Sequence, residues 1–212
     1  MELKKQLGHI FSVLIVLSFI ASVIELRALN LFGFFLMLLI FSIIIFIYIF
    51  SKKITAAYFN AEEETQIWSI ERYGFKKHKY FSKEVPMGII MPIVFLVLTL
   101  GSFPWYASFQ SEIRPGKYKQ IKKEGLLSFV EMSENDFALI SAAGVVSTLI
   151  LAFFAYLVNM PLISKIAIQF AFFNMLPISN LDGSKIFFGN RGLWLILAAI
   201  TLIALAYSFF LV

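Results

Sequence analysis

The sequence of 212 residues contains no cysteine and only two histidines. The lack of cysteine excludes both a disulfide framework and a metal site with thiolate ligands. His9 stands at the start of an apolar segment, and His78 stands among lysines, whose charge repels a metal cation. We expect neither histidine to be a metal ligand, and the two are too far apart in the chain to form a paired motif.

Charged side chains are scarce as well, at 15% of the residues, whereas 60% are hydrophobic and 25 are phenylalanine. About a quarter of the residues of an ordinary soluble domain are charged, so this composition predicts a polytopic membrane protein whose main partner is the lipid bilayer. Lysine and arginine exceed the acidic residues by 18 to 13. In a membrane protein such an excess is typical of cytoplasmic loops, and we expect no nucleic-acid partner.

The amino-terminal segment lacks the features of a cleaved signal peptide. Lys4 and Lys5 precede a long apolar run, but no small-residue cleavage site follows it. We expect this segment to remain as a membrane anchor, with the N-terminus in the cytoplasm and the protein in the cell membrane.

The apolar runs predict an all-α polytopic helical bundle that forms a single integral membrane domain over residues 1–212. About five spans are expected, at residues 9–27, 31–50, 137–158, 162–178 and 193–212. Two polar regions, at 51–86 and 110–136, separate some of these spans.

The first polar region begins with a predicted continuation of the preceding helix. We expect that helix to end at a left-handed cap at Asn60 and a short strand to follow at Thr65 to Trp68. The acidic triplet from Glu62 to Glu64 could offer oxygen ligands to a divalent cation, but a solvated face explains it more simply.

The apolar segment 87–109 is interrupted by glycine and proline, which is typical of either a kinked span or a segment that enters the membrane and returns. If it spans, lysine and arginine divide almost equally between the two sides. If it is re-entrant, sixteen of the 18 lie on the cytoplasmic side. The positive-inside rule favours the re-entrant topology, which also places Asp182 and both polar regions in or facing the cytoplasm.

A candidate functional site lies where an apolar run ends in a carboxylate. The run 162–178 is expected to be helical until Pro177 breaks it, and Asp182 follows a few residues later. An ionisable residue at such a break in a membrane protein is by default a functional candidate. The alternative is an ordinary Asn-Leu-Asp-Gly turn in water.

The order of residues around Asp182 resembles the second motif of the site-2 proteases, a family of intramembrane zinc metalloproteases. In that family the aspartate is the third zinc ligand. Two other stretches are similar to the family: one corresponds to a helix start and the other to the residues that follow its zinc-binding helix. The matching residues are Asn174, Pro177, Leu181, Asp182 and Gly183 for the motif, Ala143 and Gly144 for the helix start, and Ala56, Phe59 and Asn60 for the third stretch. The helix start departs from the family at two positions, with Val145 where proline is usual and Thr148 where asparagine is usual.

The resemblance ends at the zinc-binding helix itself. The family carries His-Glu-x-x-His there, in which two imidazoles one turn apart hold zinc and the glutamate is the general base. The register set by the stretch 56–60 puts Tyr48, Ile49 and Lys52 at these positions, so both ligands and the base are missing. The resemblance therefore implies a degenerate, proteolytically inactive member with vestigial positions, no catalytic residue and no bound zinc.

Without a metal, a carboxylate at the membrane interior needs a proton or a cation. We predict that Lys52 pairs with Asp182 and that Tyr48, one turn away, donates a second hydrogen bond to the carboxylate. The alternative is that Lys52 snorkels to the cytoplasmic headgroups and Asp182 faces water.

Three functions stay open on these residues. The protein could bind a transmembrane helix of a client or partner, which requires only the shape of the groove between the second span and the Asp182 helix. It could instead be an active metalloprotease, or another intramembrane enzyme or transporter using Lys52 and Asp182, which requires more buried polar groups than the sequence offers. It could also retain the site only as a vestige. We carry the first forward.

Overall fold

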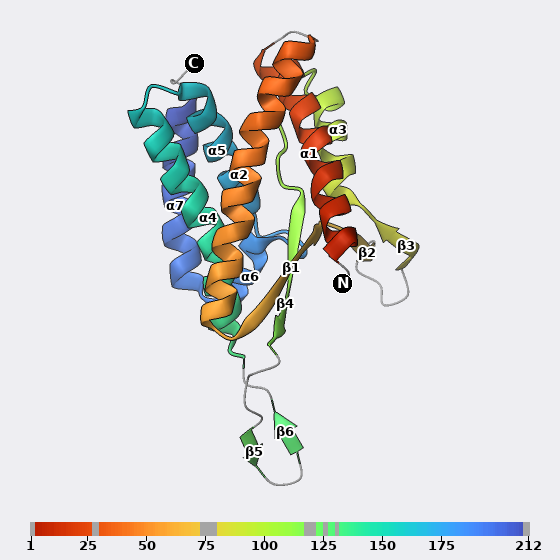
Figure 1. Ribbon diagram of the computed structural model, residues 1–212, viewed down its shortest axis with the longest axis vertical. Coiled ribbons are helices and arrows are strands. Elements are labelled where there is room, and N and C mark those ends of the chain that lie inside the picture. The colour runs from red at the N-terminus through yellow and green to blue at the C-terminus, as the bar shows by residue number, and fades with distance from the viewer. Residues whose placement is uncertain are drawn as a thin grey trace.

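A computed structural model describes residues 3–26, 30–72, 80–116, 122–124, 127–129 and 132–209 (Figure 1). The helices are α1 (Leu3–Glu25), α2 (Leu31–Tyr58), α3 (Met87–Leu98), α4 (Glu134–Leu157), α5 (Pro161–Asn174), α6 (Asp182–Gly189) and α7 (Arg191–Ser208). The strands are β1 (Ala61–Ile67), β2 (Ile70–Arg72), β3 (Tyr80–Val85), β4 (Phe109–Pro115), β5 (Lys122–Glu124) and β6 (Leu127–Phe129). His78 and the last three residues of the predicted final span lie outside the described residues.

Four of these helices are long and apolar enough to cross a membrane, namely α1 from Gln6 onward, α2, α4 and α7. This supports the membrane class and the helical architecture, and it gives four candidate spans among the described residues where about five were expected. The missing one is α5, whose 14 residues reach about 21 Å and fall short of the roughly 30 Å hydrocarbon core.

The helix α5 ends at Asn174, four residues before Ile178, where the sequence predicts its end. Pro177 has no N–H to donate and disfavours the helical conformation of the residue before it. The chain responds by closing the helix early, since the Met175 N–H already bonds to the carbonyls of the last turn of α5.

The helix α2 is longer than the predicted span 31–50. Its 28 residues extend about 42 Å, so roughly two turns lie beyond a 30 Å core. It ends as predicted, with Asn60 in the left-handed region at φ 52°. The extra turns bring Lys52 to the level where α6 begins.

The polar regions contain strands, so the fold is not purely α-helical. The strand expected at Thr65 to Trp68 is β1, and it pairs antiparallel with β4, which the sequence analysis missed. Further short ladders join β2 to β3 and β5 to β6. Side chains of β1 alternate between buried and exposed, as expected for a strand with one face against a core.

The segment 87–109 rises as α3 and returns beside it in extended form (Figure 1). Trp68 holds both of its ends: the Gly88 N–H donates to the Trp68 carbonyl at 2.8 Å, and the Trp68 N–H donates to the Ser108 carbonyl at 2.9 Å. The segment thus leaves and rejoins the fold at one point, which is the shape of a re-entrant element. Its side of the membrane remains a prediction.

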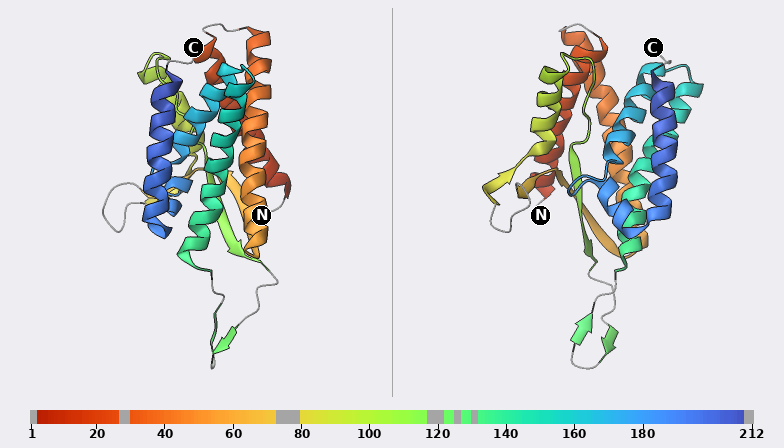
Figure 2. Two further views of the ribbon diagram at one scale, coloured as in Figure 1. Left: turned by 90° about the vertical axis from the view of Figure 1, so that its left-hand side faces the viewer. Right: turned by 180° about the vertical axis from the view of Figure 1, so that it is seen from behind.

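The long helix α2 lies between two groups of helices. Figure 2 shows α4, α5 and α7 on one side of α2 and α1 and α3 on the other, with β1 and β4 between them at one end. Hydroxyl groups bind α2 to α4, because Ser51 Oγ donates to the Ala143 carbonyl at 3.2 Å and lies 2.8 Å from Ser147 Oγ. Small residues at this contact allow the two helices to approach closely.

Candidate functional site

The carboxylate of Asp182 is fully buried at the first residue of α6, so the alternative of a turn in water is wrong. Its neighbours explain the motif. Leu181 is fully buried, and a Cβ on Gly183 would lie 2.2 Å from the Met175 carbonyl oxygen. Only glycine fits there, because the start of α6 packs against the backbone at the end of α5.

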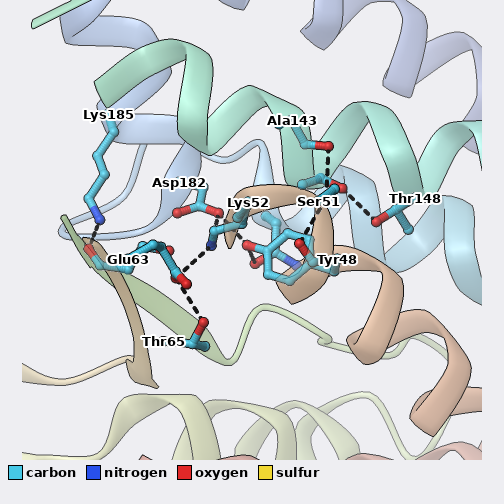
Figure 3. A network of polar contacts seen from close by, with 12 residues as sticks. Tyr48, Ser51, Lys52, Glu63, Thr65, Ala143, Thr148, Asp182 and Lys185 are labelled. Atoms are coloured by element: carbon cyan, nitrogen blue, oxygen red, sulfur yellow. Dashed lines mark hydrogen bonds and ion pairs between the residues drawn. The ribbon is translucent and has the colours of Figure 1, made fainter. Parts of the chain in front are cut away.

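Lys52 and Asp182 form the predicted ion pair (Figure 3). Lys52 Nζ lies 2.8 Å from Asp182 Oδ2, and both side chains are 0% exposed. The Tyr48 hydroxyl donates a hydrogen bond to the same oxygen. The alternative in which Lys52 snorkels to the headgroups is therefore wrong.

The geometry of α2 explains why the two donors meet at one atom. Tyr48 and Lys52 are four residues apart and share one face of the helix. Gly144 on α4 leaves room for both: a Cβ there would lie 2.6 Å from Lys52 Cδ and 2.7 Å from Tyr48 Cε2. The Ala143-Gly144 stretch thus acts through close helix packing rather than through a side-chain group.

Two other positions of the resemblance have structural roles. The Asn174 side-chain amide donates to the Phe170 carbonyl at 2.8 Å, and its oxygen lies 3.5 Å from the Tyr48 hydroxyl. Ile49, where the family has its general base, is 9% exposed and belongs to the hydrophobic core. No acid or base of α2 therefore replaces the missing glutamate at that position.

Glu63 is a site residue that the sequence analysis missed. Its Oε1 lies 3.8 Å from Lys52 Nζ and accepts a hydrogen bond of 2.8 Å from the Thr65 hydroxyl. The reading of Glu62 to Glu64 as a solvated face is wrong for Glu63, which is only 6% exposed, although Glu62 is exposed. The predicted strand begins at Thr65, two residues after Glu63. A strand that included Glu63 would have placed it on the same face as Thr65, because side chains alternate between the two faces of a strand.

Lys185, one turn after Asp182 on α6, is the second missed residue. It is partly buried, and its Nζ donates to the Ser111 carbonyl on β4 (Figure 3). Burial raises the pKa of the Asp182 carboxyl, but the ammonium groups of Lys52 and Lys185 and the hydrogen bonds from Lys52 and Tyr48 outweigh burial, so this pKa lies below its usual value. The carboxylate is thus held in its charged form.

Chemically the site is an ion pair with a phenol donor rather than a set of metal ligands. Of the three expected ligand positions, only Asp182 carries a group that binds metals, and its Oδ2 is taken by Lys52 and Tyr48. In the part of the chain that the structure describes, no group of three or more acidic or histidine side chains could hold a metal ion. That the protein is free of zinc stays a prediction.

The chain matches no protein-family model, no curated protein and no solved structure. The resemblance to the site-2 proteases therefore stays a prediction from the motif residues.

Proposed function

We propose that this protein is a membrane-embedded, proteolytically inactive relative of the site-2 proteases that binds a transmembrane segment of a client or partner protein. One observation carries the proposal. Tyr48 and Lys52, at the positions of the two imidazoles, both reach the Asp182 oxygen that would be the third zinc ligand.

This convergence supports the register and the loss of activity together. A zinc site of this type needs two side chains one turn apart on a helix and a third from another element. Here the same three positions are within bonding distance, but an ammonium joins α2 to α6 in place of a metal ion. An ammonium and a phenol cannot coordinate and activate a water molecule as zinc does.

The outer edge of β4 pairs with no other strand among the described residues, and this supports the binding of a client segment beside the site. The Gly116 N–H bonds to the Asn60 carbonyl, and the Trp68 N–H bonds to the Ser108 carbonyl. Main-chain hydrogen bonds occur at every second residue pair of an antiparallel ladder, so the N–H and carbonyl of Ser111 point away from β1. Lys185 of α6 donates a hydrogen bond to this carbonyl. An unwound part of a client helix could pair with this edge.

Restoring the zinc ligands tests the proposal. The variant Tyr48→His, Ile49→Glu, Lys52→His should bind about one zinc per chain and give the visible absorption of a four-coordinate site with cobalt(II). Adding Asp182→Ala should abolish binding. The matched control is Phe46→His, Phe50→His, which also places two histidines four residues apart on α2, but at exposed positions. If the folded triple variant binds no more metal than this control, the register and the family assignment are wrong.

A second candidate is an intramembrane acid–base function of Lys52 and Asp182. It is favoured by Glu63 Oε2 and Asp182 Oδ1, which are buried and accept no hydrogen bond from any described residue. Such oxygens are expected to hold a water molecule or a proton. In proteoliposomes with an internal pH dye, this candidate requires a proton flux that Asp182→Asn abolishes. A flux equal to that of empty liposomes excludes it.

A further inference from the structure

A polar cleft of about 340 Å³ lies beside the site, outside the four candidate spans. Its lining comes from the β1–β4 ladder, the β2–β3 hairpin, and the loop and helix around Asp182. The residues that line it are Gln66, Ser69, Glu71, Glu84, Gln110, Ser111, Glu112, Asn180 and Lys185. Its volume is within the range of cavities that hold small ligands.

The charges of the cleft are divided between its walls. Glu71 and Glu84 belong to the β2–β3 hairpin, and both are exposed. Glu112 lies on β4, and the hydrogen bond from Arg114 holds the pKa of its carboxyl below the usual range, so it is ionised. Lys185 comes from α6 on another side. The cleft is therefore acidic toward the hairpin and basic toward α6.

The α6 side has donors that lack an anion. Lys185 has the Ser111 carbonyl as its hydrogen-bond acceptor, and among the described residues no carboxylate lies within ion-pair distance of its Nζ. Burial lowers the pKa of Lys185 to about 8, although the more distant carboxylates of Asp182, Glu63 and Glu112 act in the opposite direction. A second donor on this side is the side-chain amide of Asn180, which is exposed and lines the cleft.

A carboxylate placed here would find two donors. It would neutralise the Lys185 ammonium and accept a hydrogen bond from the exposed Asn180 amide, and both residues line the cleft. The glutamates across the cleft would repel a simple anion, but they attract the ammonium of a ligand that carries both charges. The ligand that fits both walls is therefore a zwitterion.

We propose that this cleft binds free amino acids or short peptides, with the ligand carboxylate at Lys185 and Asn180 and the ligand ammonium at Glu84 and Glu71. This site is distinct from the Lys52–Asp182 pair, and it does not depend on the protein being a protease relative.

Three dipeptides of similar size test the proposal by calorimetric titration of the intact protein in detergent. Glycylglycine carries both charges, N-acetylglycylglycine lacks the ammonium, and glycylglycine amide lacks the carboxylate. We expect glycylglycine to bind at least tenfold more tightly than either analogue, because each analogue loses one wall of the cleft.

Two variants test which wall of the cleft binds which charge of the ligand. Lys185→Gln should make glycylglycine and its amide bind equally, and Glu84→Gln should reduce the preference for glycylglycine over its N-acetyl form. Lys53→Gln, an exposed lysine on α2, is the matched control and should leave all three affinities unchanged. Glu84 is exposed, so its variant remains informative if Lys185→Gln does not fold. Equal affinities of the wild-type protein for the three dipeptides, or no saturable binding of glycylglycine at millimolar concentration, would overturn the proposal.

Discussion

Lys52 Nζ lies 2.8 Å from Asp182 Oδ2, and this contact joins two residues 130 positions apart in the chain with no exposure of either side chain to solvent. A buried charge without its partner is far more costly than the pair itself. The contact therefore makes α2 and α6 energetically dependent on each other.

A double-mutant cycle measures this dependence. Lys52→Ala and Asp182→Ala should each lower the free energy of unfolding by about 3–5 kcal/mol, because each leaves one uncompensated buried charge. The double variant should lose clearly less than the sum of the two, since it leaves neither charge behind. The measurement is reversible denaturation in mixed micelles.

The exposed pair of Arg114 and Glu112 is the matched control for this cycle, because its two side chains are 54% and 43% exposed. Water screens such a pair, so Arg114→Ala and Glu112→Ala should be close to additive. If Lys52 and Asp182 are as additive as this control, their side chains do not meet in the folded protein.

Many of the apolar helices could be predicted from the sequence, because a long apolar run in a bilayer satisfies its main-chain hydrogen bonds by forming a helix. The Lys52–Asp182 pair could also be predicted, because the resemblance to the site-2 proteases aligns Tyr48 and Lys52 with two ligand positions on one helix face and Asp182 with the third. The polar regions were harder. Short strands owe their stability to a partner distant in the chain, so β4 gave no local signal that it pairs with β1.

The missed site residues show the same limit. Glu63 and Lys185 are ordinary charged residues in the sequence, and only the antiparallel ladder and the first turns of α6 bring them to Lys52 and Ser111. The length of α5 was missed for a local reason, since an apolar run continues through Pro177 while the helix cannot.

Gly144→Ala tests the close contact between α4 and α2. The new Cβ would lie 2.6 Å from Lys52 Cδ and 2.7 Å from Tyr48 Cε2, so these side chains or α4 must shift, and we expect a loss of about 1–3 kcal/mol in the free energy of unfolding. The control is Gly8→Ala on α1, where nothing lies within 4 Å of the added Cβ and the better helix propensity of alanine should cause no loss. Equal effects of the two substitutions would show that Gly144 does not set the helix contact.

Cysteine labelling tests the topology, and the absence of native cysteine makes each variant a single-site reporter. Lys53→Cys at the end of α2 and Arg114→Cys on β4 should react with an impermeant maleimide from the same side of the membrane. Asn159→Cys, in the turn between α4 and α5, should react from the other side. If Arg114→Cys reacts together with Asn159→Cys, the segment 87–109 crosses the membrane and is not re-entrant.

The last prediction concerns the pH dependence of stability, and it follows from the surroundings of Lys185. Burial lowers its pKa from the ordinary 10.5 to about 8. Of the charged groups that face it, the carboxylates of Asp182, Glu63 and Glu112 oppose this shift, whereas the Lys52 ammonium adds to it. The balance leaves the neutral amine favoured in the folded protein relative to the unfolded chain.

Between pH 8 and pH 10.5 the unfolded chain therefore binds more protons at Lys185 than the folded protein does, and the free energy of unfolding should rise with pH in this window. The rise due to Lys185 is at most about 3 kcal/mol. Lys185→Met keeps the length of the side chain without the amine, so it should be more stable than the wild type at pH 7 and lose this part of the rise. Lys53→Met, an exposed counterpart on α2, should keep the wild-type slope. The check is a series of thermal unfolding curves across the window, and an unchanged slope in Lys185→Met would mean that this amine is hydrated in the folded protein.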